Sequence, residues 1–189
     1  MARTLWAVDA IGWAQGVAWG LVGRLDRRWR HVEAVPGRVQ ELAGVLRWDP
    51  DERDAVVSAA WLHDVGFAPG LVRTGCHHVD GAVYVAGLGY ERLAGLVAFH
   101  SSGAAEASLR GVAEIVAGFG REQSPVADLL TYCDMTTGPD GSVVGLDQRL
   151  AEVAGRYGDD HVVTRGLLLS AAALRQTIER VEDRLLLAG

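Results

Sequence analysis

The sequence predicts an all-α, single-domain helical bundle over residues 1–189, with one short hairpin as its only β structure. Apolar residues recur at spacings of three and four along most of the chain, which is the period of an amphipathic helix. No run alternates convincingly between apolar and polar residues as a half-buried strand does. The chain has 189 residues, of which 49% are hydrophobic, so it can bury the core of one domain.

The first helix is expected within Leu5–Val22, where tryptophan, alanine, valine and leucine are frequent. Asp9 and Gln15 interrupt this apolar stretch, and no clean cleavage site follows before the charged run that begins at Arg24. A membrane span would need about 20 apolar residues without a carboxylate. The segment is therefore predicted to be a core helix and not an export signal. Its buried side is expected to hold Trp6, Ile11 or Trp13, and Val17.

The second helix is predicted over Arg24–Leu46. Its buried stripe begins at His31 and continues at spacings of three and four through Val35, Val39, Leu42 and Leu46. Pro36 and Gly37 interrupt this pattern, so a kink or break is expected one turn after His31.

The third helix has a complete start signal, with Asp49 as N-cap, Pro50 as first residue and Glu52 three residues after the cap. It is expected to end near Gly66, a plausible C-terminal glycine. Later helices are expected over residues 77–88, 91–100, 104–118, 125–134, 146–157 and 160–187.

Three further local signals complete the pattern. Ser124 is the expected cap of the helix over 125–134. The turn residues at 136–141 mark the one place where a short hairpin could form, within residues 136–145. Asp80, in the first turn of the helix over 77–88, is interpreted as a cap or turn residue.

The charge composition restricts the function. All eighteen basic residues are arginine, and a chain without lysine has no P-loop lysine, Schiff-base lysine or Ser-Lys dyad. The formal net charge is -6 and there is no basic run, which argues against a nucleic-acid-binding role. We therefore expect a small ligand as partner, including an anionic one held by a metal, and neither nucleic acid nor a membrane.

Cysteine usage predicts a cytoplasmic protein. Two cysteines, Cys76 and Cys133, are too few for a disulfide scaffold in a chain of this length. Both are expected to be reduced thiols. Cys133 is expected to pack in the core and not to act as a nucleophile, because nothing in the sequence suggests a lowered thiol pKa.

Four residues in different helices carry groups suited to a metal. His63 and Asp64 form an adjacent pair near the expected end of a helix, His31 lies one helix upstream on an apolar stripe, and Asp134 ends an apolar helix far downstream. Burying such groups is costly unless something compensates for their polarity. Imidazole nitrogens with carboxylates are the ligand set of a borderline divalent metal. Four protein ligands would leave open positions for water, which implies catalysis.

The order His31, then the Trp61–Gly66 block (Trp-Leu-His-Asp-Val-Gly), then Asp134 resembles the HD superfamily of metal-dependent phosphohydrolases. The signature of that superfamily is a histidine, a His-Asp pair and a distal aspartate. The resemblance covers about residues 24–157, the core of a single HD-type domain, and is most specific over residues 60–66. By similarity, the metal ligands would be His31, His63, Asp64 and Asp134.

Members of the superfamily with two metals add further histidines. His77 stands four residues before Gly81, as the first additional motif requires, with His78 where a proline would be. The later His-His pair is reduced to Phe99-His100. The resemblance therefore implies two metals bridged by Asp64 and held by a hexad made of His31, His63, Asp64, His77, His100 and Asp134.

Two kinds of HD protein do not fit this sequence: members with a third metal and the Gly-Tyr-Pro branch. A third metal is not expected, because Arg27 and not an acid precedes His31 by one turn. The Gly-Tyr-Pro branch, which acts on cyclic dinucleotides, is disfavoured because Ser101-Ser102-Gly103 follows His100 in place of that motif. Phe67 also replaces the lysine that often follows the His-Asp pair.

The resemblance implies hydrolysis of a small phosphate ester, such as a nucleotide, by water activated on one or two divalent ions of Mn, Fe, Co, Ni, Zn or Mg. Catalytic roles, in metal binding or proton transfer, fall to Asp64, His63, His77 and His100. Without lysine, arginine must meet the remaining phosphate charge. Arg73 is the nearest candidate by sequence, and His78 is a second substrate-binding candidate. The simpler interpretation of these two is a solvated loop arginine and a surface or partly buried histidine at a helix start.

Two other functions stay open at this point. Some HD-fold enzymes use the same six ligands to hold two irons and activate oxygen, so a di-iron oxygenase is one alternative. A non-catalytic helical module for signalling or partner binding is the other, although the intact ligand set argues against it. Two irons with a redox-active spectrum would favour the oxygenase, and activity with Mn or Co on phosphate esters would favour the hydrolase. An oligomer is compatible with the sequence.

Overall fold

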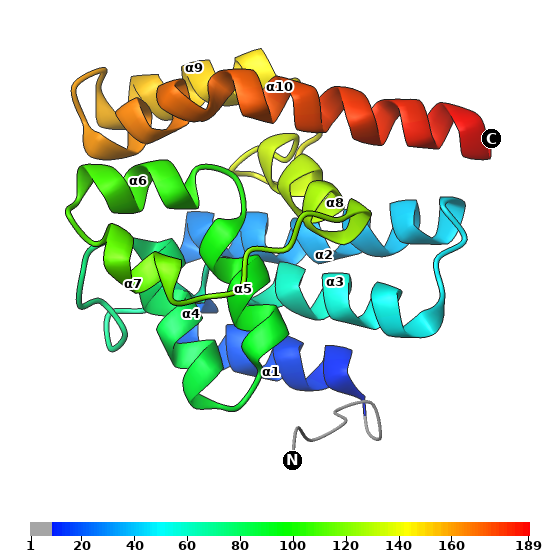
Figure 1. Cartoon of the computed structure of the whole chain (residues 1–189), viewed down its shortest axis with the longest axis horizontal. Coiled ribbons are helices and arrows are strands. Elements are labelled where there is room, and N and C mark those ends of the chain that lie inside the picture. The colour runs from blue at the N-terminus through cyan, green and yellow to red at the C-terminus, as the bar shows by residue number, and fades with distance from the viewer. Residues whose placement is uncertain (1–8) are drawn as a thin grey trace.

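Ten α-helices and one 3-10 turn make up the part of the chain that the computed structural model describes, residues 9–189 (Figure 1). In chain order these are α1 (Ala10–Val22), α2 (Asp26–Val45), α3 (Pro50–Leu62), the 3-10 turn η1 (Val65–Phe67), α4 (His77–Gly87), α5 (Glu91–Phe99), α6 (Gly103–Leu109), α7 (Ala113–Ala117), α8 (Pro125–Met135), α9 (Leu146–Tyr157) and α10 (Val162–Ala188). No strand occurs within residues 9–189, and the all-α prediction is confirmed.

Capping side chains begin two of these helices where the sequence predicts. The Asp49 carboxylate accepts a hydrogen bond from the amide of Glu52 at 3.0 Å, and α3 begins at the next residue, Pro50. The Ser124 hydroxyl accepts from the amide of Ala127 at 3.3 Å and caps α8. Each cap satisfies an amide that has no partner inside the helix.

The first helix is shorter than the apolar stretch. Asp9 accepts a hydrogen bond from the amide of Gly12 at 2.8 Å and so caps α1. Of the residues expected on its buried side, Trp6 lies outside the described residues. Ile11, Trp13 and Val17 are partly buried against the core. The fully buried positions of α1 are Ala14, Ala18 and Val22.

The sequence predicts a kink or break at Pro36, and the break does not occur, because α2 runs unbroken over Asp26–Val45 with Pro36 inside it. A proline removes one backbone hydrogen bond from a helix. The residues around it are buried, namely Val32, Val35 and Val39. Packing on both sides of Pro36 therefore holds the helix together where that hydrogen bond is missing.

Two other predicted boundaries also differ from the structure. The α3 helix ends at Leu62 and not near Gly66, which lies in the following 3-10 turn. The helix expected over residues 104–118 is divided into α6 and α7. Gly111, between them, has a φ of 73°, a left-handed conformation that a helix cannot continue through.

The hairpin predicted within residues 136–145 is reduced to one antiparallel bridge between Thr137 and Val143. Two backbone hydrogen bonds flank it: Gly138 donates to Ser142 at 2.7 Å, and Val144 donates to Thr136 at 3.0 Å. This bridge is too short to form a strand. It follows α8 directly and fixes the backbone of Gly138.

The helices pack around two apolar cores. α3 packs against both α1 and α2, and every residue from 55 to 62 is buried (Figure 1). α4 and α5 pack on each other beside this layer, and α10 lies across α6, α8 and α9 at the top of the view. A smaller core beneath α9 and α10 is made by Met135, Leu146, Val153, Leu167 and Leu174. The candidate site lies where the two cores meet.

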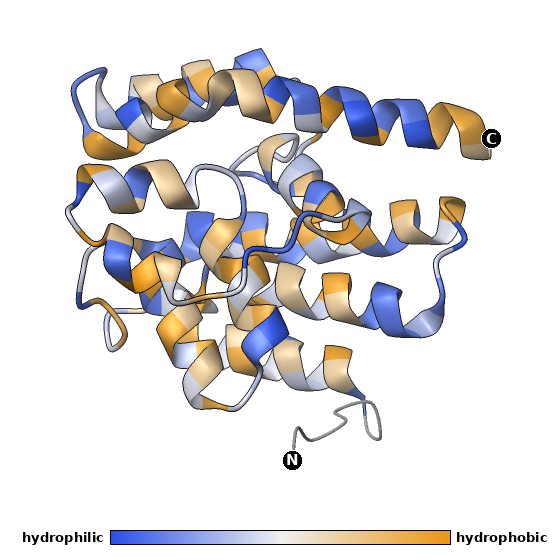
Figure 2. Cartoon of the chain, in the orientation of Figure 1, coloured by the Kyte–Doolittle hydropathy of each residue, from blue (hydrophilic) through white to orange (hydrophobic). Residues whose placement is uncertain are grey.

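Hydropathy follows this arrangement. Figure 2 shows apolar residues along α4 and α5 and again at the C-terminal end of α10. Leu186 and Leu187 at that end are 80% and 89% exposed. No helix within the described residues has both the length and the apolar character needed to cross a membrane.

Candidate metal centre

The structure brings the predicted ligands together from five helices. His31 lies in the second turn of α2, His63 and Asp64 follow α3, and Asp134 lies near the end of α8. Three groups of side chains within the described residues have ligand atoms within 4.8 Å of one another and could each hold a metal ion. The first group is His31, His63 and Asp64, the second is His77, His78 and His100, and the third is Cys76, His78 and Glu106. The first two groups together with Asp134 are called the buried cluster below.

Three histidines of the buried cluster share one hydrogen-bonding pattern. Nδ1 of His63 lies 2.6 Å from the carbonyl oxygen of Ala60, and Nδ1 of His100 lies 2.7 Å from that of Val97. Nδ1 of His31 lies 3.2 Å from the carbonyl oxygen of Gly138, next to the β-bridge. A carbonyl oxygen only accepts hydrogen bonds, so each Nδ1 carries the proton and each Nε2 presents a lone pair. This is the orientation that protein metal sites impose on histidine ligands.

Nε2 of His63 lacks a suitable partner within the described protein. It is buried without any hydrogen-bond partner and lies 3.7 Å from Oδ2 of Asp64. A neutral imidazole has one N–H, so with Nδ1 protonated this is a contact between two acceptors. Nε2 of His31 lies 3.1 Å from Oδ1 of Asp134, a contact that is a hydrogen bond when Nε2 carries a proton. A cation between the imidazole and the carboxylate would satisfy both, and the donor set therefore fits a divalent metal.

Asp64 lies at the centre of the cluster. Its Oδ2 accepts a hydrogen bond from Nη1 of Arg28 at 2.8 Å, and its Oδ1 lies 3.4 Å from Nε2 of His77. The His77 ring stacks on Phe67 with ring centroids 4.1 Å apart. The guanidinium of Arg28 also lies over Phe67, 3.7 Å from the ring centroid. Phe67 thus orients two groups that face Asp64.

Electrostatics keep the carboxylates ionised, and burial keeps His77, His78 and His100 neutral. Burial alone would raise the pKa of Asp64, but the charge of Arg28, followed by the neighbouring histidines, holds that pKa well below its usual value. Burial is outweighed in the same way for Asp134, whose interaction with His31 lowers its pKa. Burial is the main cause that lowers the pKa of His77, His78 and His100. These are the protonation states that bind a divalent ion.

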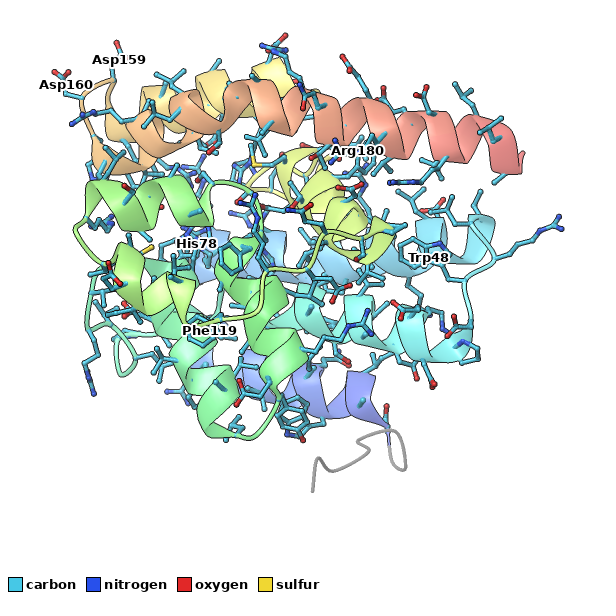
Figure 3. The ribbon with its side chains drawn as sticks, viewed as in Figure 1. Trp48, His78, Phe119, Asp159, Asp160 and Arg180 are labelled. Atoms are coloured by element: carbon cyan, nitrogen blue, oxygen red, sulfur yellow. The ribbon has the colours of Figure 1, made fainter. Side chains whose placement is uncertain are left out.

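His78 is fully enclosed and is not a surface or partly buried histidine. It is 1% exposed, its Nδ1 lies 3.6 Å from Oε2 of Glu106, and its Nε2 lies 3.5 Å from the hydroxyl of Ser101. Its ring centroid is 4.4 Å from that of His100. Figure 3 shows His78 inside the bundle, below α6. Sequence reasoning missed Glu106, because only the fold brings α6 over the start of α4.

A cavity of about 50 Å³ opens onto the buried cluster. Its lining includes Arg28 of α2 and, from α9, Arg149, Arg156 and Tyr157. A larger cavity of about 500 Å³ between α5, α8 and α10 reaches His100 but no other member of the cluster. The small cavity, where carboxylates, imidazoles and arginines converge, is therefore the candidate reaction site.

Arg73, predicted as a substrate-binding residue, does not line the small cavity. Its side chain is exposed on the loop before α4 and donates to the carbonyl oxygen of Val72 at 3.1 Å. Asp80, interpreted as a cap or turn residue, is buried and accepts hydrogen bonds from the amides of Arg73, Thr74 and Gly75. Asp80 thereby anchors the loop that precedes His77.

No family model matches the chain. No curated protein and no solved structure matches it either. The described residues themselves form a helical bundle whose buried histidine and aspartate groups could hold a metal ion.

Proposed function

We propose that this chain is a metal-dependent phosphohydrolase of the HD type. The observation that carries the proposal is the shared orientation of His31, His63 and His100, whose Nδ1 atoms donate to backbone carbonyl oxygens while their Nε2 lone pairs remain available. The buried carboxylates Asp64 and Asp134 supply the oxygen ligands. The order of these residues along an all-α chain supports the HD assignment.

The ligands divide between two positions. His31, His63, Asp64 and Asp134 would hold the first ion, and His77 and His100 of the second group would supply nitrogen ligands for a second. Asp64 has one oxygen 3.7 Å from His63 and the other 3.4 Å from His77, so its carboxylate can serve both positions. A divalent ion bound here would supply acidified water and a Lewis acid for phosphoryl oxygens.

The remaining groups of the cavity bind phosphate and handle the proton. Arg28, Arg149 and Arg156 line the cavity with guanidinium groups, which recognise phosphoryl oxygens bidentately. Glu106 faces Nδ1 of His78, which leaves Nε2 of His78 as a proton acceptor at the cavity wall. Burial lowers the pKa of His78, so that imidazole is neutral at neutral pH and its Nε2 is an acceptor. The substrate we propose is a small phosphorylated molecule.

Elemental analysis of the protein as purified, followed by a phosphate-release screen over nucleotides and sugar phosphates, tests the proposal. We expect His63→Ala and Asp64→Ala to lose both metal and activity while the far-UV circular dichroism stays nearly unchanged. His161→Ala is the matched control, because His161 is exposed at the start of α10 and belongs to none of the groups that could hold a metal ion. Full activity in the Asp64→Ala protein would overturn the proposal.

A di-iron oxygenase is the second candidate function. The observation in its favour is the nitrogen-rich group of His77, His78 and His100, because imidazole together with carboxylate also suits iron. Two irons per chain with a redox-active absorption spectrum, and no phosphate release with Mn or Co, would favour this alternative over the hydrolase.

A further inference from the structure

A second set of charged side chains lies beyond the buried cluster, between α2 and α9. Arg27, Arg149 and Arg156, called the arginine cluster here, all contact one carboxylate, that of Glu152. The nitrogen–oxygen distances are 3.0 Å for Arg27, 2.7 Å for Arg149 and 3.5 Å for Arg156. One acid thus faces three guanidinium groups, which leaves an excess of two positive charges in a chain whose net charge is -6.

The arginine cluster has hydrogen-bond donors with no acceptor. Nε of Arg149 and Nε of Arg156 are buried and have no hydrogen-bond partner. Arg149 is only 6% exposed, so solvent reaches little of its side chain. Burial lowers the pKa of Arg156, and the neighbouring charges of Arg28 and Arg149 lower it further, although Tyr157 and Glu152 oppose this. Buried donors without acceptors are costly, so the arrangement favours an anion as ligand.

Cavities connect the arginine cluster to the candidate metal centre. Arg149 and Arg156 line the small cavity at the buried cluster, and they also line a neighbouring cavity of about 200 Å³. That second cavity reaches His31 and Arg27. A third cavity of about 270 Å³ shares Arg27 and Arg149 with the second. One ligand could therefore lie at the metal centre and at the arginine cluster at the same time.

We infer that the arginine cluster is a subsite for a second phosphate group, so that the substrate class is a molecule with at least two phosphates, such as a nucleoside diphosphate or triphosphate. This inference rests on the proposed function, which places the reacting phosphoryl group at the buried cluster. A second phosphate, with a charge between -1 and -2, matches the excess of positive charge left by Glu152. It would also accept from the Nε atoms of Arg149 and Arg156, because the guanidinium fork fits phosphate oxygens.

The competing explanation is that the arginine cluster only joins α2 to α9 through Glu152. Calorimetric titration of the metal-free full-length chain, in the presence of a chelator, separates the two explanations. The probes are inorganic phosphate, pyrophosphate and tripolyphosphate, which carry no base or sugar. We expect tripolyphosphate to bind at least about tenfold more tightly than phosphate, and added salt to weaken its binding.

Arginine variants show which residues bind tripolyphosphate. Arg149→Gln and Arg156→Gln should each weaken tripolyphosphate binding about tenfold or more, since each removes a charge-assisted contact. Arg27→Gln is the variant expected to fold normally, because the Arg27 side chain is 56% exposed, and it should weaken binding severalfold. Arg175→Gln is the matched control, because Arg175 is exposed on α10 and pairs with Asp147. Unchanged affinity in Arg27→Gln and Arg149→Gln would overturn the subsite.

The test also distinguishes this inference from the proposed function. If the wild-type chain binds tripolyphosphate at the arginine cluster but takes up no metal, the subsite stands and the proposed hydrolase fails. If the chain binds metal and releases phosphate but binds tripolyphosphate no more tightly than phosphate, the hydrolase stands and the subsite is overturned. Asp64→Asn should lose metal and keep tripolyphosphate binding, because the acid that pairs with Arg27, Arg149 and Arg156 is Glu152 and Asp64 pairs with Arg28.

Discussion

Gly66 and Gly81 meet backbone to backbone, and this contact holds the start of α4 against the turn that follows α3. A Cβ atom at Gly66 would collide with the carbonyl oxygen of His77 and would lie 2.6 Å from the amide nitrogen of Gly81. A Cβ atom at Gly81 would lie 3.1 Å from the amide nitrogen of Gly66. The close approach places His77 beside Asp64, where Nε2 and Oδ1 are 3.4 Å apart. Gly66 is therefore required for packing of the site and not as a helix end.

Gly66→Ala should destabilise the protein and weaken metal binding at the second position. The added methyl group meets backbone atoms, which cannot move aside as a side chain can, so we expect a loss of about 2–3 kcal/mol in the free energy of unfolding. Displacement of α4 should also separate His77 from Asp64. Urea unfolding and metal titration measure the two effects. Gly70→Ala is the control, because a Cβ atom there would meet nothing within 4 Å. Equal stability in both variants would contradict the packing argument.

His100→Ala should lower the metal content from about two ions per chain to about one. The Nδ1 hydrogen bond to Val97 leaves Nε2 of His100 as a ligand atom, and His100 belongs to the group with His77 and His78. Removing one of its two nitrogen ligands should weaken the second position far more than the first. Elemental analysis after gel filtration gives the count, with His161→Ala as the control. An unchanged count would mean that His100 is not a ligand.

Local signals in the sequence were sufficient for the helices that begin with a cap and for most residues of the buried cluster. Asp49 and Ser124 act on amides three residues away, so their sequence neighbours determine the helix starts. His78 is buried beside Glu106, and two of the arginines that line the small cavity, Arg149 and Arg156, come from α9. These residues meet the cluster only through tertiary packing. Arg73 was preferred because it is close in sequence to His77, yet the hydrogen bonds of its loop to Asp80 direct it outward.

Pro36 and Gly66 show that local sequence signals also fail to predict the backbone where tertiary packing decides it. A proline inside a helical pattern predicts a break, but buried neighbours on both sides of Pro36 keep α2 continuous. A glycine after a helical pattern predicts a helix end, but Gly66 is explained by a contact with α4, which begins eleven residues later at His77. In both cases the deciding interaction is with residues that the local pattern does not contain.

Asp134 should make the free energy of unfolding of the metal-free protein fall as the pH falls below about 4. Its folded-state pKa lies well below the value of about 3.9 in an unfolded chain, because interactions with the surrounding histidines outweigh burial. The unfolded state therefore binds this proton at a higher pH than the folded state. The resulting stabilisation is fully present above about pH 4 and is lost as the pH falls through the folded value, which amounts to about 2 kcal/mol or more.

Urea unfolding of the metal-free protein between pH 5 and pH 2.5 measures this dependence. Asp134→Asn should flatten the fall in the free energy of unfolding below pH 4, while Asp159→Asn, at an exposed position between α9 and α10, should leave the wild-type slope nearly unchanged. The histidines with lowered pKa values contribute to the slope of every variant at higher pH, so the difference between variants isolates Asp134. Equal slopes in wild type and Asp134→Asn would show that this carboxylate is not stabilised by its neighbours.

Both cysteines should be inert in the native protein. Cys76 and Cys133 are free and fully buried, and burial is the main cause that raises the pKa of Cys76 to about 11 and that of Cys133 to about 12. At pH 8 the reactive thiolate is then about a thousandth or less of each thiol. Native protein at pH 8 should react with neither iodoacetamide nor a disulfide reagent, and both thiols should react after unfolding in guanidinium. In the Cys133→Ala variant, any reaction of the native protein must come from Cys76. A thiol of the native chain that reacts quickly at pH 8 would mean that Cys76, 3.7 Å from Nδ1 of His78, is held as a thiolate by the buried cluster.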